Sequence, residues 1–195
     1  MAEWWSYRPS DFLMFSGRTW SRLVQGWNEA LWPVQLAFAA LALAMLAGAA
    51  RAPMRHARWI TGVLALAWGW VGWAFHWQRF AEVNTAASGY AVASGLQALM
   101  LGVAAATTAG GLPGRGWRAT GLALAGAAVA YPLATVALRR GWAQAEVAGA
   151  LPDPTALLTV GLLLALPVRW RALLLAIPVL AVAVGAMTAW LLWAG

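Results

Sequence analysis

The chain has 195 residues, of which 63% are hydrophobic and 10% are charged, and its mean hydropathy is +0.68. A water-soluble domain of this composition would lack the polar surface needed to cover itself, so the composition predicts a protein embedded in lipid. The net charge is +7, but the arginines that give it are scattered between apolar stretches, so no nucleic-acid partner is expected. The absence of cysteine excludes disulfides, thiolate metal sites and cysteine nucleophiles.

Residues 1–32 are expected to form an amphipathic segment at the membrane surface. Ser10 is a candidate N-cap, and after it apolar and charged residues repeat at helical spacing on opposite sides. The segment lacks the unbroken apolar core of a signal peptide, so no cleavage is expected. One interpretation is an interfacial anchor and the other is a lid or docking helix. In the second, Tyr7, Arg8 and Asp11 fold back over the outward-facing vestibule predicted below.

The remaining residues, 33–195, predict an all-α integral membrane fold, a bundle of six transmembrane helices without a soluble domain. Helices satisfy their backbone hydrogen bonds internally, and about twenty apolar residues cross a hydrocarbon core of about 30 Å. The lipid bilayer is therefore an expected partner. The expected spans are 33–50, 59–77, 89–108, 120–138, 154–168 and 172–193.

The arginines between the spans indicate an orientation. Loops 51–58, 113–118 and 169–171 fall on the same side of a six-span bundle, and together they contain seven arginines and no acid. By the positive-inside rule this side faces the cytoplasm. Both termini are therefore expected outside the cytoplasm.

The polar side chains within the spans gather toward the outer half of the bundle, and such residues are the default functional candidates in a membrane. The fifth span, 154–168, has only 15 residues, which is about 22 Å of helix and shorter than the bilayer core. If Asp153 is its N-cap, its outer end lies below the surface and the stretch 142–151 must dip inward. This predicts an outward-open polar vestibule. The candidate solute-binding residues are His76, Gln97, Tyr131, Asp153, Asn84, Glu82 and Gln35.

Two prolines lie inside predicted spans. Pro132 would free the carbonyl of Ala128, and Pro178 would free the carbonyl of Leu174. The bend at each proline is interpreted either as part of a binding site or gate, or as a fixed kink filled by a neighbouring side chain.

Catalysis and metal binding are weaker interpretations of the same polar residues. His76 with Glu82 or Asp153 has the groups for acid–base chemistry, but a lone histidine at a helix end is more often an interface residue. A metal site that adds Asn84 follows no recognised ligand spacing. Haem is disfavoured because His56 lies at the opposite side, and no cofactor is expected.

Three tryptophans, Trp70, Trp73 and Trp77, share one stripe of the second predicted span. Such a stripe is able to cage a cation or stack on a pigment or quinone. Core packing and anchoring at the membrane interface account for the same pattern and are favoured.

Several landmarks resemble a family of small bacterial multi-pass membrane proteins catalogued as a domain of unknown function. They are residues 7–16, 27–33, His76 with Arg79, Phe80 and Asn84, and residues 152–155 with 159–164. The resemblance implies the topology above and a location in the bacterial inner (cytoplasmic) membrane. Family members tend to have cysteine at position 153 and Gly-His at positions 141–142, so thiol or two-histidine metal chemistry is not implied for this chain.

The sequence thus leads to three hypotheses. The first is a protein that binds or translocates a small polar solute or ion through an outward-facing vestibule. The second is a non-catalytic accessory or scaffold subunit that contacts a membrane protein partner or another copy of itself through tryptophan-rich faces. A membrane-embedded enzyme that uses His76 with a carboxylate is the least favoured.

Overall fold

The computed structural model describes residues 14–107, 110–138 and 141–193, and within these residues the fold is all-α with no β-strand. The lid residues Tyr7, Arg8 and Asp11, and the candidate N-cap Ser10, lie outside the described residues. The α-helices are α1 (Gly17–Leu31), α2 (Val34–Arg51), α3 (Pro53–Trp70), α4 (Ala87–Ala106), α5 (Arg115–Ala137), α6 (Pro152–Ala165) and α7 (Arg171–Trp193).

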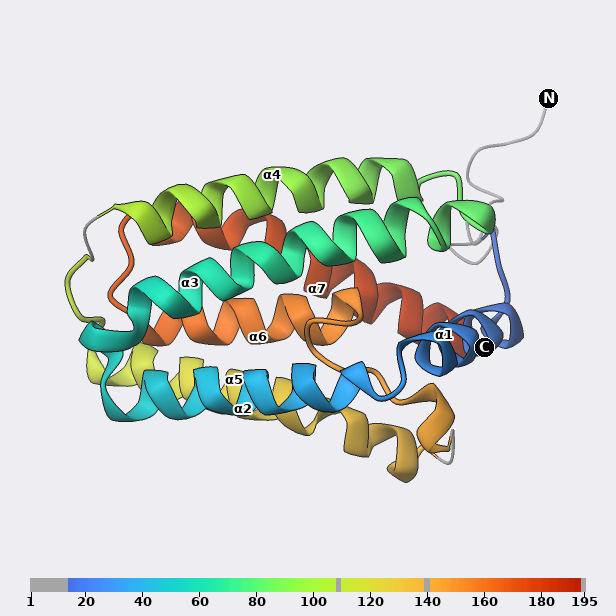
Figure 1. The fold of residues 1–195 in the computed structure, drawn as a ribbon, viewed down its shortest axis with the longest axis horizontal. Helices are drawn as coiled ribbons and strands as arrows, with labels where there is room; N and C mark the ends of the chain where they lie inside the picture. The colour runs from blue at the N-terminus through green and yellow to red at the C-terminus, as the bar shows by residue number, and fades with distance from the viewer. Residues whose placement is uncertain (1–13, 108–109, 139–140, 194–195) are drawn as a thin grey trace.

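Helices α2 to α7 run back and forth along one bundle, and α1 packs at one end of it (Figure 1). The π-helical turn η3 (Val71–Trp77) extends α3 directly, so α3 and η3 together cover the second predicted span. Of the described helices, α2, α4 and α7 are long and apolar enough to cross a membrane, whereas α6 is apolar but shorter.

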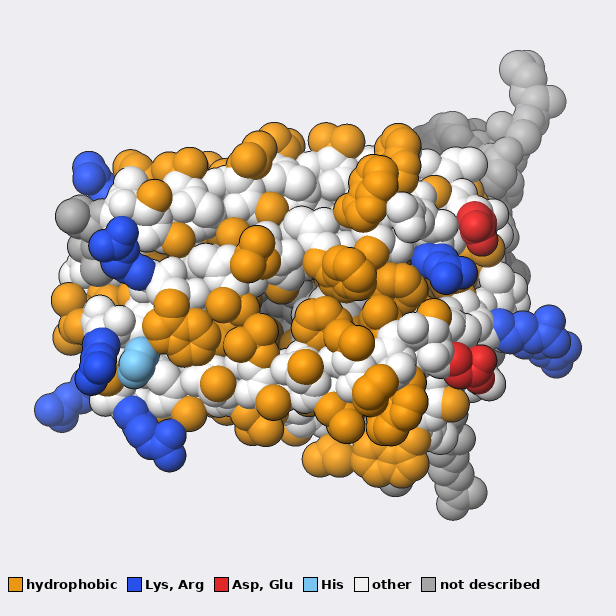
Figure 2. Space-filling view, in the orientation of Figure 1, with side chains coloured by type: hydrophobic (Ala, Val, Ile, Leu, Met, Phe, Trp, Pro, Cys, Tyr) orange, Lys and Arg blue, Asp and Glu red, His pale blue; other side chains and the backbone are white. Residues whose placement is uncertain are grey.

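Large apolar side chains are exposed on the outer surface of the bundle. Leu66 on α3, Leu99 on α4 and Leu173 on α7 expose 76%, 69% and 59% of their surface. On the face shown in Figure 2, most of the visible arginines lie at the end with the α2–α3 and α6–α7 connections. The opposite end carries the visible acids together with other arginines, and apolar side chains cover the middle. This pattern favours insertion with charges at the two membrane surfaces.

At the arginine-rich end, three guanidinium groups satisfy backbone carbonyls near the C-terminal ends of α2, α4 and α6. The last carbonyls of a helix have no intrahelical donor, and a cation there also interacts well with the helix dipole. The pairs are Arg118 Nη2 with Ala50 O at 2.7 Å, Arg58 Nε with Ala105 O at 3.1 Å, and Arg171 with Leu163 O and Leu166 O, both at 2.9 Å.

Helix α6 lies at the centre of the bundle, where it packs against α5, α7, α2 and α3. Ten of its 14 residues are buried, and its length is about 21 Å at 1.5 Å per residue. Close packing against α5 depends on glycine: a Cβ at Gly121 would lie 2.7 Å from the backbone nitrogen of Ala165, and a Cβ at Gly161 would lie 2.7 Å from the carbonyl oxygen of Gly121. The centre of the fold is therefore a short helix enclosed by protein.

The connection before α6, residues 142–151, folds inward, as its predicted dip requires, and we call it the inward segment. The turn η5 (Trp142–Gln144) is largely exposed, but residues 145–151 are buried. Gly149 has a φ of 91°, and its N–H donates to Thr155 Oγ1 at 2.7 Å. Helix α6 begins at Pro152 with Leu151 as N-cap, so Asp153 lies in the first turn and is not the N-cap that the sequence predicted.

Helix α1 is held against this inward segment by side-chain hydrogen bonds. Asn28 Nδ2 donates to Ala143 O at 3.0 Å and Ala145 O at 2.8 Å, and Trp27 Nε1 donates to Ala150 O at 3.0 Å. Because residues 145–151 are buried outside regular structure, the bonds to Ala145 and Ala150 satisfy carbonyls that would otherwise be costly to bury.

Candidate functional site

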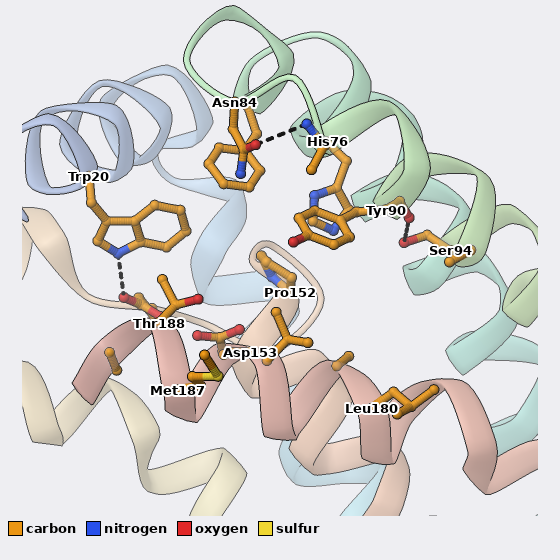
Figure 3. Close-up of a pocket in the computed structure, with 18 of the residues that line it drawn as sticks. Trp20, His76, Asn84, Tyr90, Ser94, Pro152, Asp153, Leu180, Met187 and Thr188 are labelled. Atoms are coloured by element: carbon orange, nitrogen blue, oxygen red, sulfur yellow. Dashed lines mark hydrogen bonds between the residues drawn. The ribbon is translucent and has the colours of Figure 1, made fainter. Parts of the chain in front are cut away.

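A cavity of about 510 Å³ lies between α4, α7 and the N-terminal end of α6, next to α1. Most of its lining is apolar, in contrast to the polar vestibule expected from the sequence. In Figure 3, Trp20 on α1 stands opposite His76 and Tyr90, with Asp153 between these walls. The polar side chains that line the cavity are His76, Asn84, Tyr90, Ser94, Tyr131, Glu146, Asp153 and Thr188, together with the indoles of Trp20 and Trp68.

The cavity exists because α4 and α7 meet at one point and then separate. Gln97 Nε2 on α4 donates to Leu174 O on α7 at 3.0 Å, and both residues are buried. About one helical turn further, Ser94 and Ile177 already line the cavity. From there α7 runs away from α4 toward the α1 end of the bundle (Figure 1). The space between them is closed on the arginine-rich side and widens on the other.

Asp153 brings a carboxylate to the wall of the cavity. It stands in the first turn of α6, where unpaired backbone N–H groups and the helix dipole favour a negative charge. Gly185 on α7 makes room for it, since a Cβ at that position would lie 2.7 Å from Asp153 Cγ. In the described structure the carboxylate forms no hydrogen bond and no ion pair.

His76 reaches the cavity from the π-helical turn η3. A π-turn adds a residue to a helical turn and is often found at functional sites. The side chain is 6% exposed and its ring lies 5.7 Å from that of Tyr90 and 6.1 Å from that of Phe80. Among the described residues, Nδ1 of His76 has no hydrogen-bond partner. A buried polar nitrogen of this kind is uncommon and calls for a functional or structural explanation.

Aromatic rings build the wall around the histidine. Phe80 stacks on Tyr90 with ring centroids 6.3 Å apart, and Trp20 meets Phe80 edge to face at 5.5 Å. Trp20 Nε1 also points to Glu146 Oε1 at 3.4 Å, which ties α1 to the inward segment at the rim. The cavity therefore combines carboxylates with aromatic faces.

Comparison with known proteins places the chain in a family. A model described as a family of unknown function, DUF6064, matches residues 18–194. The chain belongs to DUF6064. This confirms the resemblance to a domain of unknown function, and the match covers every helix of the cavity. No curated protein and no solved structure matches the chain.

Four of the predicted site residues line the cavity of this DUF6064 protein: His76, Asn84, Tyr131 and Asp153. The other three lie elsewhere. Gln97 is directed at α7, Gln35 Nε2 donates to Asn28 O at 3.1 Å, and Glu82 is exposed in the short turn η4 (Phe80–Glu82). The sequence reasoning missed Trp20, Tyr90, Ser94 and Glu146, which come from α1, α4 and the inward segment.

The stripe tryptophans of the DUF6064 chain, Trp70, Trp73 and Trp77, lie outside the cavity. Trp73 and Trp77 expose 60% and 51% of their surface, while Trp70 packs toward Trp27 and Phe38 with ring centroids 6.2 and 6.4 Å away. None of the three stripe tryptophans lines the cavity. Within the described residues, no group of three or more histidine, aspartate or glutamate side chains is arranged to hold a metal ion.

Proposed function

We propose that this DUF6064 protein is a multi-pass membrane protein that binds a small solute in the cavity between α4, α6 and α7. The cavity of about 510 Å³ is the observation that carries the proposal. Its volume falls in the range of about 300–1,000 Å³ that is usual for small-ligand sites, and a few polar groups in an apolar lining are typical of them. In this proposal Asp153 and His76 contact the solute and Asn84 and Tyr131 complete the polar lining.

The position of the cavity supports access from outside the cytoplasm. It lies toward the end of the bundle opposite the arginine-rich connections, and the positive-inside rule assigns those connections to the cytoplasm. Both termini then lie outside. Translocation is an extension of the proposal: it requires α4 and α7 to part at Gln97 and Leu174, where they now close the cavity on the cytoplasmic side.

An accessory or scaffold role is the alternative. Such a subunit works with a dry, filled bundle and does not require an open cavity with a carboxylate in its wall. The observed cavity therefore favours solute binding.

Cysteine labelling tests the location and the access together, because the native chain has no cysteine. Ala93 lines the cavity, whereas Leu96 on the same helix is 53% exposed on the outer surface. With a charged, membrane-impermeant thiol reagent added to intact cells, we expect labelling of Ala93→Cys and Thr188→Cys. Leu96→Cys faces lipid and should stay unlabelled, and so should Arg55→Cys at the cytoplasmic end.

Each other result counts against the proposal. Labelling of Arg55→Cys without labelling of Thr188→Cys would show that the bundle has the opposite orientation in the membrane. Labelling of Leu96→Cys as fast as Ala93→Cys would show that the outer surface of α4 is in water and that no membrane covers it.

A further inference from the structure

The charges around the cavity are one-sided. Its described lining contains two acids, Asp153 and Glu146, and none of the arginines. Glu146 is 7% exposed and has the Trp20 indole beside it at 3.4 Å. Asp153, in contrast, has no hydrogen bond or ion pair within the described structure, and it stands in the first turn of α6. A carboxylate in apolar surroundings is costly unless an opposite charge or hydrogen bonds compensate it.

The rest of the lining is suited to a cation with an apolar body. The faces of aromatic rings attract cations, most strongly where water is excluded. Trp20, Phe80 and Tyr90 provide such rings in mutual contact, and Figure 3 shows Trp20 and Tyr90 on either side of the space above Asp153. The remaining surface, along α7 from Ile177 to Leu192, is mainly aliphatic.

His76 adds a second polar side chain to the wall of this space. His76 is 94% buried, lines the cavity, and has a ring nitrogen that is unpartnered within the described structure. Gly185 leaves room for the second polar group, because a Cβ there would overlap the Asp153 carboxylate. The chain thus keeps both polar groups beside an open volume.

The geometry points to a lipophilic organic cation as the ligand: an ammonium group held by the Asp153 carboxylate and the aromatic faces, with its apolar body along α7. This inference rests on the proposed function and adds the chemical class of the solute. The described lining differs from that of other sites. An anion would need basic donors, a sugar would need many hydroxyl partners, and an inorganic cation would need a cluster of oxygen ligands.

Three probes of similar size and different charge test the class. They are benzyltrimethylammonium, its neutral isostere neopentylbenzene, and the anion phenylmethanesulfonate. Binding of tritiated benzyltrimethylammonium is measured on the full chain in nanodiscs of uncharged lipid, with the other two as competitors. We expect saturable binding of the cation, competition by neopentylbenzene only at about tenfold or higher concentration, and no competition by the anion.

Variants locate the effect. Asp153→Asn keeps the shape of the side chain and should weaken cation binding by about tenfold or more, with competition by neopentylbenzene measured in the same sample. Tyr90→Leu provides a second test that leaves the carboxylate in place, and it should weaken cation binding by a few-fold. Glu82→Gln removes the same charge from an exposed residue outside the cavity and should leave binding unchanged.

The failures are distinguishable. If neopentylbenzene competes as well as the unlabelled cation and Asp153→Asn changes nothing, the cavity binds solutes but the assignment to cations is overturned. If the tritiated cation does not bind to the purified chain while Ala93→Cys is labelled in cells, only the assignment to cations is overturned. If Ala93→Cys is not labelled either, the proposed function falls with it. If Glu82→Gln and Asp153→Asn weaken cation binding equally, the cation responds to the surface charge of the protein, and the inference is also overturned.

Discussion

Gln97 on α4 donates its hydrogen bond to the one carbonyl that Pro178 leaves without a donor in α7. Pro178 has no N–H, so Leu174 O lacks its intrahelical partner, and Gln97 Nε2 lies 3.0 Å from it. Of the two interpretations of this proline, the hydrogen bond favours the second, because a neighbouring side chain satisfies the freed carbonyl. The same bond joins α4 to α7 at the closed end of the cavity.

This relationship predicts energetic coupling between positions 97 and 178. Gln97→Leu should destabilise the protein, and Pro178→Ala should relieve part of that cost because Leu174 O regains an N–H donor within α7. The expected coupling is about 1 kcal/mol, the scale of a hydrogen bond between membrane helices. Reversible unfolding of both single variants and the double variant measures it. Gln97 Oε1 is unpartnered within the described structure, but its contribution cancels in the cycle. Simple additivity would contradict the assignment.

Gly185→Ala should disturb Asp153. The new Cβ would lie 2.7 Å from Asp153 Cγ, so either the carboxylate or α7 must move, with an expected loss of about 1–3 kcal/mol. In an Asp153→Ala background most of this cost should disappear, because the overlapping atoms are gone. Thermal unfolding in detergent checks both variants. Gly95→Ala on α4 is the control, since a Cβ there meets nothing within 4 Å. A loss as large in the Asp153→Ala background as in the native one would mean that the carboxylate is not the obstacle.

Gly161→Ala should be among the most damaging small substitutions in the bundle. A Cβ on Gly161 would overlap the backbone of Ala125 in α5, and backbone atoms cannot rotate away. We expect a loss of about 2 kcal/mol or more and a lower yield of folded protein. Gly126→Ala, also on α5 but with open space at its Cβ position, should be neutral or slightly stabilising. Equal effects of the two variants in thermal unfolding would argue against close packing of α5 on α6.

Asn28→Leu should loosen the inward segment. It removes both hydrogen bonds to the carbonyls of Ala143 and Ala145, and the carbonyl of the buried Ala145 is then left without this donor. Hydrogen exchange of the amides in residues 141–151 should become faster. Gln25→Leu is the matched control, because the Gln25 amide bonds only to Glu29 on its own helix. Unchanged exchange in Asn28→Leu would show that α1 does not hold the segment in place.

Much of the helical framework could be predicted from the sequence. Long apolar runs bounded by arginine, glycine and proline mark helix ends, and the observed ends of α2, α4, α5 and α7 lie within a few residues of the expected spans. The shortness of α6 and the inward path before it also followed from length alone, since 15 residues cannot reach across the bilayer core. Whether the six helices cross a membrane stays a prediction that labelling must test.

The rotation of each helix was much harder to predict. Spans that are apolar all round carry little information about which face points inward. Gln97 was assigned to the vestibule, although the freed carbonyl of Leu174 attracts it to another site. The π-turn η3, which contains Trp73 and Trp77, departs from α-helical geometry, and no sequence signal revealed it. Trp20 and Glu146 are 126 positions apart, and only the tertiary fold brings them together.

The enclosure of α6 constrains how the polypeptide is made. Its 14 residues leave the ribosome before α7, the helix that covers one of its sides. In the proposed membrane protein they are too few to span the hydrocarbon core unaided. A nascent chain that ends after Ala165 would therefore hold an unshielded fragment with a carboxylate at its start. We expect α5, α6 and α7 to pack together as one unit. Until α7 has emerged from the ribosome, the incomplete chain should be open to degradation by quality-control proteases.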